Sequence, residues 1–306
     1  MVTDAITSVF PNNTDVVSVQ GGYGVMIGTI IFFNILNRIV SYIGVPVAVV
    51  KHAVNKEEEA WKWKNLLLSW IHAFIVGLWD ILCFYYYPEI WQDLITHITP
   101  FTYYMVAVST GYFMYDFGDL IVQKKVLEMW QLTLHHIAVT SMFFYNLTTR
   151  RCVAYNVVAL MAEINSFFLH SRKLMQMQQF KFSSPIYRAN ALVNLVTFLF
   201  CRGFGLGRIT YGMIVEGHRV DSVYFYTLTG SMFIMNMINP GLFIILLKND
   251  FLRKDYHSKA TKKQLRGSGE SVKPVQNGLH PTESTDSLPG YSKLLAEGSI
   301  DAHKID

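Results

Sequence analysis

Histidine and carboxylate side chains occur inside stretches of this sequence that are otherwise apolar. Histidine binds and releases a proton near neutral pH, and a neighbouring carboxylate can orient its ring and stabilise the charged form. A central Asp, Lys or Arg costs about 2.5–3.5 kcal/mol to insert into a membrane, so each such residue needs a physical reason. The residues concerned are Asp80, Asp116, Asp119, Glu163, His72, His135, His136 and His170.

Two interpretations of these residues stand side by side. In the first, His135, His136 and Asp116 perform acid–base chemistry on a lipid or acyl chain, while Asp119, Glu163, His170 and His72 contact the substrate. In the second, the same groups form a hydrogen-bonded network that joins membrane helices. No metal site is expected, because adjacent histidines point about 100° apart on a helix and the sequence has no HExxH motif.

A second set of polar residues within the apolar segments is assigned to helix packing. Arg202 lies in the middle of such a segment and is expected to act as a counter-ion to Glu163 or Asp80. The remaining members of the set are Asp80, Asn34, Asn194, Asn236 and Asn239.

Composition indicates the class of protein. Of the 306 residues, 51% are apolar and only 16% are charged, and the mean hydropathy is +0.26. Soluble domains carry about 25% charged residues. This composition excludes a nucleic-acid-binding module and a disordered hub, and the three cysteines lack the spacing of a disulfide-rich scaffold. The sequence therefore predicts an all-α, polytopic transmembrane helical bundle.

Seven segments are long and apolar enough, or nearly so, to span a bilayer, which takes about 20 residues. The fourth is short, so a partly re-entrant segment is an alternative for it. The predicted spans are 24–50, 65–87, 101–122, 131–147, 152–171, 189–214 and 223–247.

The distribution of Lys and Arg predicts the orientation of these spans. Loops 51–64, 123–130 and 172–188 and the start of the tail are rich in Lys and Arg, whereas the opposite side has only Arg150, Arg151 and Arg219. Basic loops stay in the cytosol, so the N-terminus is predicted outside and the C-terminus inside. Residues 1–23 then form an extracellular arm, 24–50 an anchor, and 257–306 a disordered cytosolic tail.

This orientation gathers the polar residues at a common depth. Asp116 and Asp119 lie in the cytosolic half of the third span, and His135 and His136 begin the fourth span at the same side. Glu163 and His170 share one face of the fifth span, because they are seven residues apart. We therefore expect one polar pocket that faces the cytosol and contains all of these residues, together with His72.

Two glycosylation sequons fall on the predicted outer side. Asn12 lies in the polar arm and is the expected acceptor, whereas Asn146 is too close to the membrane. In the tail, the sequence from Tyr291 to Leu294 matches a tyrosine-based sorting signal, a short pattern that often arises by chance.

These motifs, in this order, resemble the TLC domain, a membrane domain shared with ceramide synthases. The resemblance runs from roughly Glu58 to Asp255 and implies a six-helix domain over 56–256 around a lipid-accepting cavity, preceded by one extra span. The sequences that carry it are the Trp-Lys-Trp-Lys-Asn run at 61–65, Tyr-Phe-Met-Tyr-Asp at 112–116, the His135–His136 pair, and the stretches 163–172 and 170–175.

One departure from ceramide synthases affects the activity that the resemblance implies. Ceramide synthases carry an Asp-x-x-Asp pair where this sequence has Glu163 and Asn165, and there is no homeobox-like region, which argues against sphingoid N-acylation. Asn165 is carried over as a substrate contact. The sequence is more similar to the subgroup of TLC domain-containing proteins.

This resemblance implies a regulator of plasma-membrane phospholipid composition and fluidity, which restrains the incorporation of polyunsaturated acyl chains. Its partners would be membrane lipids, either phospholipids or fatty acyl groups, and not nucleic acids, and no cofactor is expected. One alternative is an acyltransferase that uses the paired histidines with acyl-CoA as co-substrate. A second is a lipid-binding scaffold or transporter without chemistry. The endoplasmic reticulum is the alternative location, and the sequence does not define an oligomeric state.

Overall fold

The computed structural model describes residues 17–51 and 53–252, and all regular secondary structure in these ranges is helical. Asn12, Tyr291 and the predicted tail at 257–306 lie outside the described residues. The longer helices are α2 (Val19–Ile43), α4 (Lys56–Tyr86), α5 (Pro100–Val122), α6 (Trp130–Thr149), α7 (Val153–Met177), α8 (Pro185–Thr197), α9 (Gly205–Glu216) and α10 (Ser222–Leu247). Short elements complete the order: α3 (Val47–Val50), the 3₁₀ turns η2 (Pro88–Trp91) and η4 (Gly217–Arg219), and the π-helical η3 (Phe198–Phe204) and η5 (Lys248–Leu252).

This architecture confirms an all-α polytopic bundle. Within the described residues, five helical runs meet the length and hydropathy of a membrane span: α2, α4, α7, the run Pro185–Arg219 and the run Ser222–Asp250. The other two predicted spans correspond to α5 and α6, which are long enough to cross but carry Asp116, Asp119, His135 and His136. α6 is a continuous helix of 20 residues, not the broken turn of a re-entrant segment.

The first predicted span, 24–50, is wrong at its C-terminal end. Gly44 adopts φ 91°, and its N–H bonds to the Val40 carbonyl, which closes α2 at Ile43. A positive φ is favourable for glycine because it has no Cβ, and Pro46 two residues later cannot donate to a continuing helix. The apolar residues that follow form the separate short helix α3.

The helix that contains the second predicted span, 65–87, begins before it, at Lys56. The side chain of Asn55 caps α4 by accepting a hydrogen bond from the Glu58 N–H, and Glu57, Glu58 and Glu59 lie in the first turn. An Asn cap and acidic first-turn residues both stabilise a helix N-terminus. The first turns of α4 are therefore a charged extension of an apolar span.

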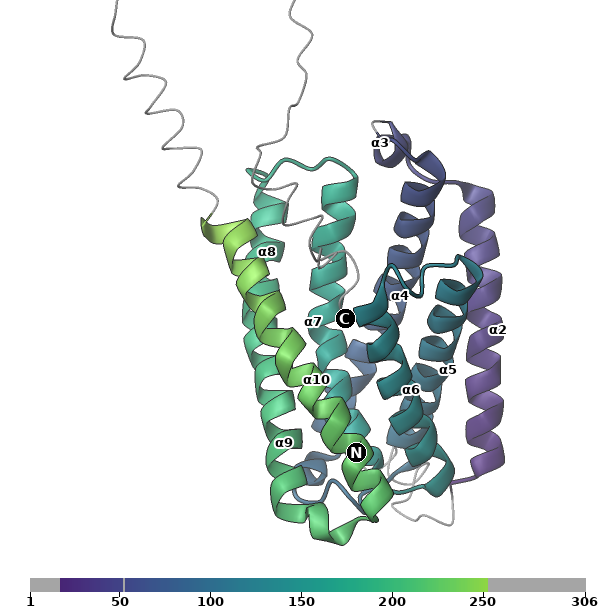
Figure 1. The fold of residues 1–306 in the computed structure, drawn as a ribbon, viewed down its shortest axis with the longest axis vertical. Helices are drawn as coiled ribbons and strands as arrows, with labels where there is room; N and C mark the ends of the chain where they lie inside the picture. Colours follow the sequence, from purple (N-terminus) through teal and green to yellow (C-terminus); the bar gives the residue numbers. More distant parts are fainter. Residues whose placement is uncertain (1–16, 52, 253–306) are drawn as a thin grey trace, which may run out of the picture. The chain divides into compact units, whose positions relative to one another are not determined.

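The chain divides into two compact units, Met1–Pro240 and a second that begins at Gly241 within α10. The described part of the second unit is the end of α10 and η5. In the first unit, α2 lies along α5 and α4 lies along α7 (Figure 1).

Two glycines allow these helix pairs to approach closely. A Cβ built on Gly77 of α4 would meet the Ile164 backbone of α7 at 3.2 Å. On Gly111 of α5 it would overlap the carbonyl oxygen of Met26 on α2. Both contacts are with backbone atoms, which cannot move aside as a flexible side chain can.

Replacing Gly111 by Ala should loosen the α2–α5 contact. The new methyl group overlaps backbone, and overpacking of this kind costs about 1–3 kcal/mol. Gly118→Ala on the same helix is the matched control, because no atom lies within 4 Å of its Cβ position. Thermal unfolding in detergent micelles should show a lower melting temperature for Gly111→Ala only. Equal melting temperatures for the two variants would contradict this packing.

Candidate functional site

A cavity of about 960 Å³, part of it open to the surroundings, lies within the first unit. Its walls come from α6, α7, η3, α9 and the Ser222–Pro240 part of α10, with Phe113 of α5. That volume includes open space at the mouth of the cavity, and residues of five helical elements and of α5 line it.

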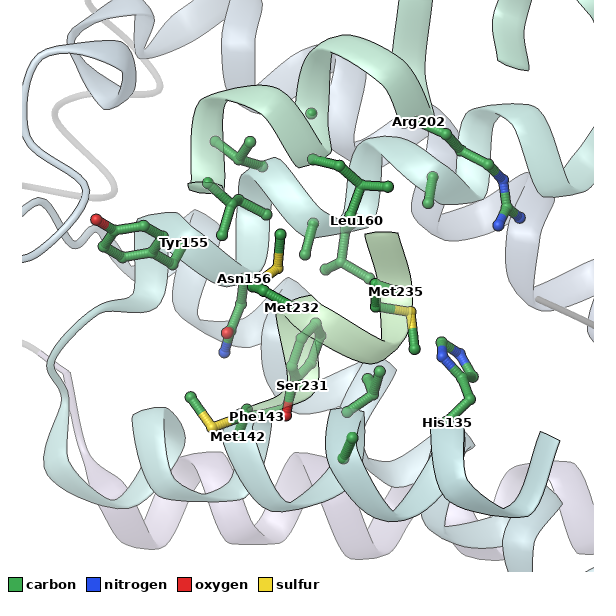
Figure 2. A pocket seen from close by; sticks show the side chains of 18 of the residues that line it. His135, Met142, Phe143, Tyr155, Asn156, Leu160, Arg202, Ser231, Met232 and Met235 are labelled. Carbon is green, nitrogen blue, oxygen red and sulfur yellow. The ribbon is translucent and has the colours of Figure 1, made fainter. Parts of the chain in front are cut away.

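The cavity wall is apolar in the middle and polar at its ends. Met142, Phe143, Leu160 and Met232 line the middle, with the hydroxyl of Ser231 among them (Figure 2). Figure 2 places His135 and Arg202 on one side of this apolar stretch and Tyr155 and Asn156 on the other. Glu163 and Ser166 also line the wall. An apolar space with a few polar groups suits an amphipathic ligand.

The paired histidines face different environments. His135 lines the cavity, whereas His136 is 4% exposed and its Nε2 lies 2.9 Å from Asp116 Oδ2. These two atoms are close, although His136 Nε2 has no assigned hydrogen bond within the described residues. The ring centroids of the two histidines are 5.6 Å apart. Only His135 can touch a molecule in the cavity directly.

A second polar cluster, made of Trp61, Asn65, Asp116, Asp119 and His136, holds α4, α5 and α6 together. The amide of Asn65 donates to Asp116 Oδ1 and, at 3.2 Å, to Asp119 Oδ2. The indole of Trp61 donates to Asp119 Oδ2 at 2.8 Å. Two of the sequence motifs, 61–65 and 112–116, thus meet through their polar side chains.

His72 and Glu163 join α4 to α7. His72 Nδ1 lies 3.6 Å from Glu163 Oε2, and the imidazole stacks on the Tyr112 ring with centroids 3.9 Å apart. Tyr112 in turn hydrogen-bonds to Ser69 at 2.8 Å. His72 therefore lies against Glu163, which lines the cavity.

Asn165 belongs to a third cluster, centred on Arg202. Arg202 Nε donates to Asn165 Oδ1 at 2.8 Å, and Nη2 donates to Ser166 Oγ at 2.9 Å. The Asn165 amide donates to Asn194 Oδ1 at 2.9 Å. Arg202 lies in the π-helical η3, an element that often occurs at functional sites. Neutral amide and hydroxyl groups therefore hold Arg202. An acidic counter-ion at Glu163 or Asp80 stays a prediction.

The single pocket expected from the sequence is separated into these three arrangements. Of the predicted site residues, His135 and Glu163 line the cavity. Asp116, Asp119 and His136 form the cluster behind His135, while His72 and Asn165 contact residues of the cavity wall. His170 is buried beyond Glu163 and is not part of the wall. These residues lie at a similar depth in the membrane but face different sides of their helices. The sequence predicts the depth and does not predict the side.

The residues assigned to helix packing mostly form hydrogen bonds. Asn194, Asn236 and Asn239 pair with other helices or with their own backbone, and Asn34 bonds to its own helix. Asp80 is fully buried, and neither carboxyl oxygen has a hydrogen-bond partner in the described part of the chain. The second sequon residue, Asn146, is also fully buried, and its amide donates to Asn156 and to the Cys152 carbonyl, which agrees with the expectation that it is not an acceptor.

Sequence reasoning did not assign a site role to Trp61, Asn65 or Ser166. Asn65 had a detectable signal, because it is a polar residue at the start of an apolar segment. Ser166 had none, because serine is common in membrane helices and often bonds its own backbone, as it does here to Ala162.

Asn165→Leu should destabilise the bundle. The change removes an acceptor from the buried Arg202 guanidinium, and loss of a partner for a buried charged group costs about 2 kcal/mol or more. Asn34→Leu is the control, because within the described residues that exposed amide bonds only to the Ile30 carbonyl of its own helix, and its loss costs about 0.5 kcal/mol or less. Unfolding in mixed micelles, followed by circular dichroism, measures both. Similar small losses in the two variants would contradict the structural role given to Asn165.

Comparison with known proteins identifies the family of this chain. Residues 62–248 match the TLC domain. The chain is 33% identical to TLC domain-containing protein 2 of Danio rerio over 80% of its own length and 94% of that protein. It is 26% identical to TLC domain-containing protein 1 of Rattus norvegicus over 78% and 93% of the two chains. It is 30% identical to TLC domain-containing protein 2 of Homo sapiens over 65% and 75%. No solved structure matches significantly. The chain belongs to the TLC domain family.

Proposed function

We propose that the cavity binds an acyl chain of a membrane lipid, and that the protein thereby regulates phospholipid composition and membrane fluidity. The observation that carries this proposal is the apolar middle of the cavity between polar ends, with His135 and Glu163 on its wall. An acyl chain fits the apolar middle, and an ester or carboxyl group finds hydrogen-bond partners at an end. The resemblance to TLC domain-containing proteins supports the finer role, which is to restrain the incorporation of polyunsaturated chains.

In this proposal the cavity holds the acyl chain, which is the part of a lipid that differs between saturated and polyunsaturated species. Its wall includes the flexible side chains Met142, Met232 and Met235. Methionine adapts its shape to irregular neighbours, so these side chains can close around the kinks of a polyunsaturated chain. In this proposal the protein selects among acyl chains by shape rather than by charge.

Filling the cavity tests this proposal. Ala159→Phe adds a ring to a residue of the cavity wall, and Val196→Phe adds one to a side chain that is 47% exposed on α8. Lipid that co-purifies with the full-length protein is measured by native mass spectrometry. We expect Ala159→Phe to reduce bound acyl lipid about tenfold, which corresponds to about 1.4 kcal/mol, and Val196→Phe to leave it unchanged.

The same variants, expressed in cells that lack the endogenous protein, connect binding to the cellular role. Wild type and Val196→Phe should restore the phospholipid acyl profile, and Ala159→Phe should not. If Ala159→Phe binds lipid and restores the profile as wild type does, the cavity is not the site of function.

Acyl transfer is the second candidate, and the position of His135 favours it. His135 would take the proton of an acceptor hydroxyl as that oxygen attacks the acyl-CoA carbonyl, and coenzyme A would leave as the thiol after receiving the proton. His136, held beside Asp116, would position the neighbouring His135.

Labelled acyl-CoA and a lysophospholipid, added to the purified protein, would then give a product that depends on His135. Bound lipid without product and without a change in cellular acyl profile would indicate the scaffold or transporter alternative.

We further propose that the protein resides in the plasma membrane with its C-terminus in the cytosol. The basic residues of loops 51–64, 123–130 and 172–188 support this orientation. Protease added to intact cells should leave a C-terminal epitope tag intact and should digest the tag after permeabilisation. Digestion of the tag in intact cells would show the opposite orientation, with the C-terminus outside. A tag retained in the endoplasmic reticulum would show that the protein resides there and not in the plasma membrane.

A further inference from the structure

The turn that joins α7 to α8, residues 178–184, connects two helical runs that can each span a membrane. It lies at one end of the bundle (Figure 1). Because the helices on both sides of it enter the membrane, the turn and the first residues of α8 lie at a membrane surface. The α7–α8 surface is defined here by five exposed residues of this region: Phe180, Lys181, Phe182, Ile186 and Arg188.

The α7–α8 surface carries positive charge that no neighbouring acid balances. Lys181 and Arg188 are both exposed, and among the described residues no Asp or Glu oxygen lies within 4.0 Å of either side chain. The sequence contains no Asp or Glu between Glu163 and Glu216. The two charges are therefore available to an anion from outside the chain.

The other basic loops, 51–64 and 123–130, contain acids of their own. Lys62 pairs with Glu58 at 3.0 Å, and Lys125 pairs with the same carboxylate at 3.1 Å. Membrane orientation depends on Lys and Arg, and Asp and Glu contribute little to it. The lack of acids in the sequence around the α7–α8 turn is therefore not a requirement of orientation.

Aromatic rings flank Lys181 in the sequence. Phe180 and Phe182 are both exposed, and so is Ile186 at the start of α8. Aromatic rings are favourable at the boundary between lipid headgroups and acyl chains, and a lysine there extends its ammonium group toward the headgroups. The α7–α8 surface thus offers apolar and basic groups to the same layer of the bilayer.

Hydrogen bonds and ring packing fix the shape of this turn. The Phe180 N–H donates to the Met175 carbonyl at 2.9 Å, which closes the end of α7. The Phe182 ring meets the Tyr187 ring edge-on with centroids 5.0 Å apart, and the Gln176 amide donates to Tyr187 Oη at 2.8 Å. A surface that is already ordered loses less conformational entropy when it binds.

We propose that the α7–α8 surface binds an anionic phospholipid of the surrounding leaflet. Lys181 and Arg188 pair with the negatively charged headgroup, and the two phenylalanine rings lie among the upper parts of the acyl chains. Arginine can donate two parallel hydrogen bonds to a phosphate, and lysine acts as a point charge. A zwitterionic headgroup such as phosphocholine adds a cation that this pair repels. The site is separate from the cavity and does not depend on the function proposed for the cavity.

Photolabelling tests the proposal. The full-length protein is placed in phosphatidylcholine nanodiscs with a phosphatidylserine that carries a photoactivatable group next to its headgroup, and labelled peptides are identified by mass spectrometry. Label is expected on residues 178–188. Unlabelled phosphatidylserine should compete with it, and additional phosphatidylcholine should not. Added salt should weaken the labelling, because ions screen exposed charges.

A pair of double variants locates the charge that matters. Lys181→Gln with Arg188→Gln should reduce labelling of 178–188 about tenfold or more. Lys56→Gln with Lys124→Gln is the matched control, because it removes the same net charge from exposed lysines of the other two basic loops, and it should leave the labelling unchanged. All four side chains are exposed, so both variants should keep the melting temperature of wild type.

Three results would overturn the proposal. Equal competition by phosphatidylcholine would show lipid contact without a headgroup preference. Equal loss of label in the two double variants would show that net charge attracts the lipid and that the α7–α8 surface does not select it. Unchanged labelling in the Lys181 and Arg188 variant would remove the role of these residues. Ala159→Phe, which fills the cavity, should leave this labelling unchanged, so failure of one site is distinguishable from failure of the other.

Discussion

The contact between α4 and α7 is the constraint on which the rest of the structure depends. Gly77 lets the two backbones approach until a methyl group would lie 3.2 Å from Ile164. At that separation Trp70 reaches Ser171 with a 2.7 Å hydrogen bond, and His72 reaches Glu163. A bilayer offers no water to these groups, so each must find its partner on the neighbouring helix. The pairing fixes the rotation of α7 and with it the residues that α7 presents to the cavity.

The same demand for partners explains how the polar residues are divided. Asn65, Asp116 and Asp119 satisfy one another at the junction of α4, α5 and α6, and Asn165 and Ser166 satisfy Arg202 on the other side of α7. Groups bound in this way have less capacity to bind a ligand. The cavity wall retains His135 and Glu163, so the chemistry available to a bound lipid is narrower than the number of buried polar residues suggests.

His72 lies between two spaces in the bundle. One nitrogen faces Glu163 of the cavity, and the ring lines a smaller groove beside α2. The span that precedes the TLC domain is thus more than an anchor, because α2 forms a wall of a groove that a residue of the domain core also lines.

Much of the fold follows from local sequence alone. Apolar runs of sufficient length locate the spans, and the basic residues in every second loop predict the orientation. Both signals depend only on the cost of placing each residue in lipid. The errors lie at boundaries that hydropathy does not report. Gly44 ends α2 inside an apolar run through its backbone conformation, and Asn55 begins α4 in a charged stretch through its cap.

The sequence by itself determined that this protein is a helical membrane bundle, that it resembles the TLC domain, and which residue types lie buried at a common depth. Only the tertiary structure decided which of them share a space. His135 and His136 are adjacent, yet one faces the cavity and the other Asp116. Which face of a helix meets a partner depends on the rotation and crossing of that helix. Those are set by packing between segments distant in the chain, so no local pattern encodes them.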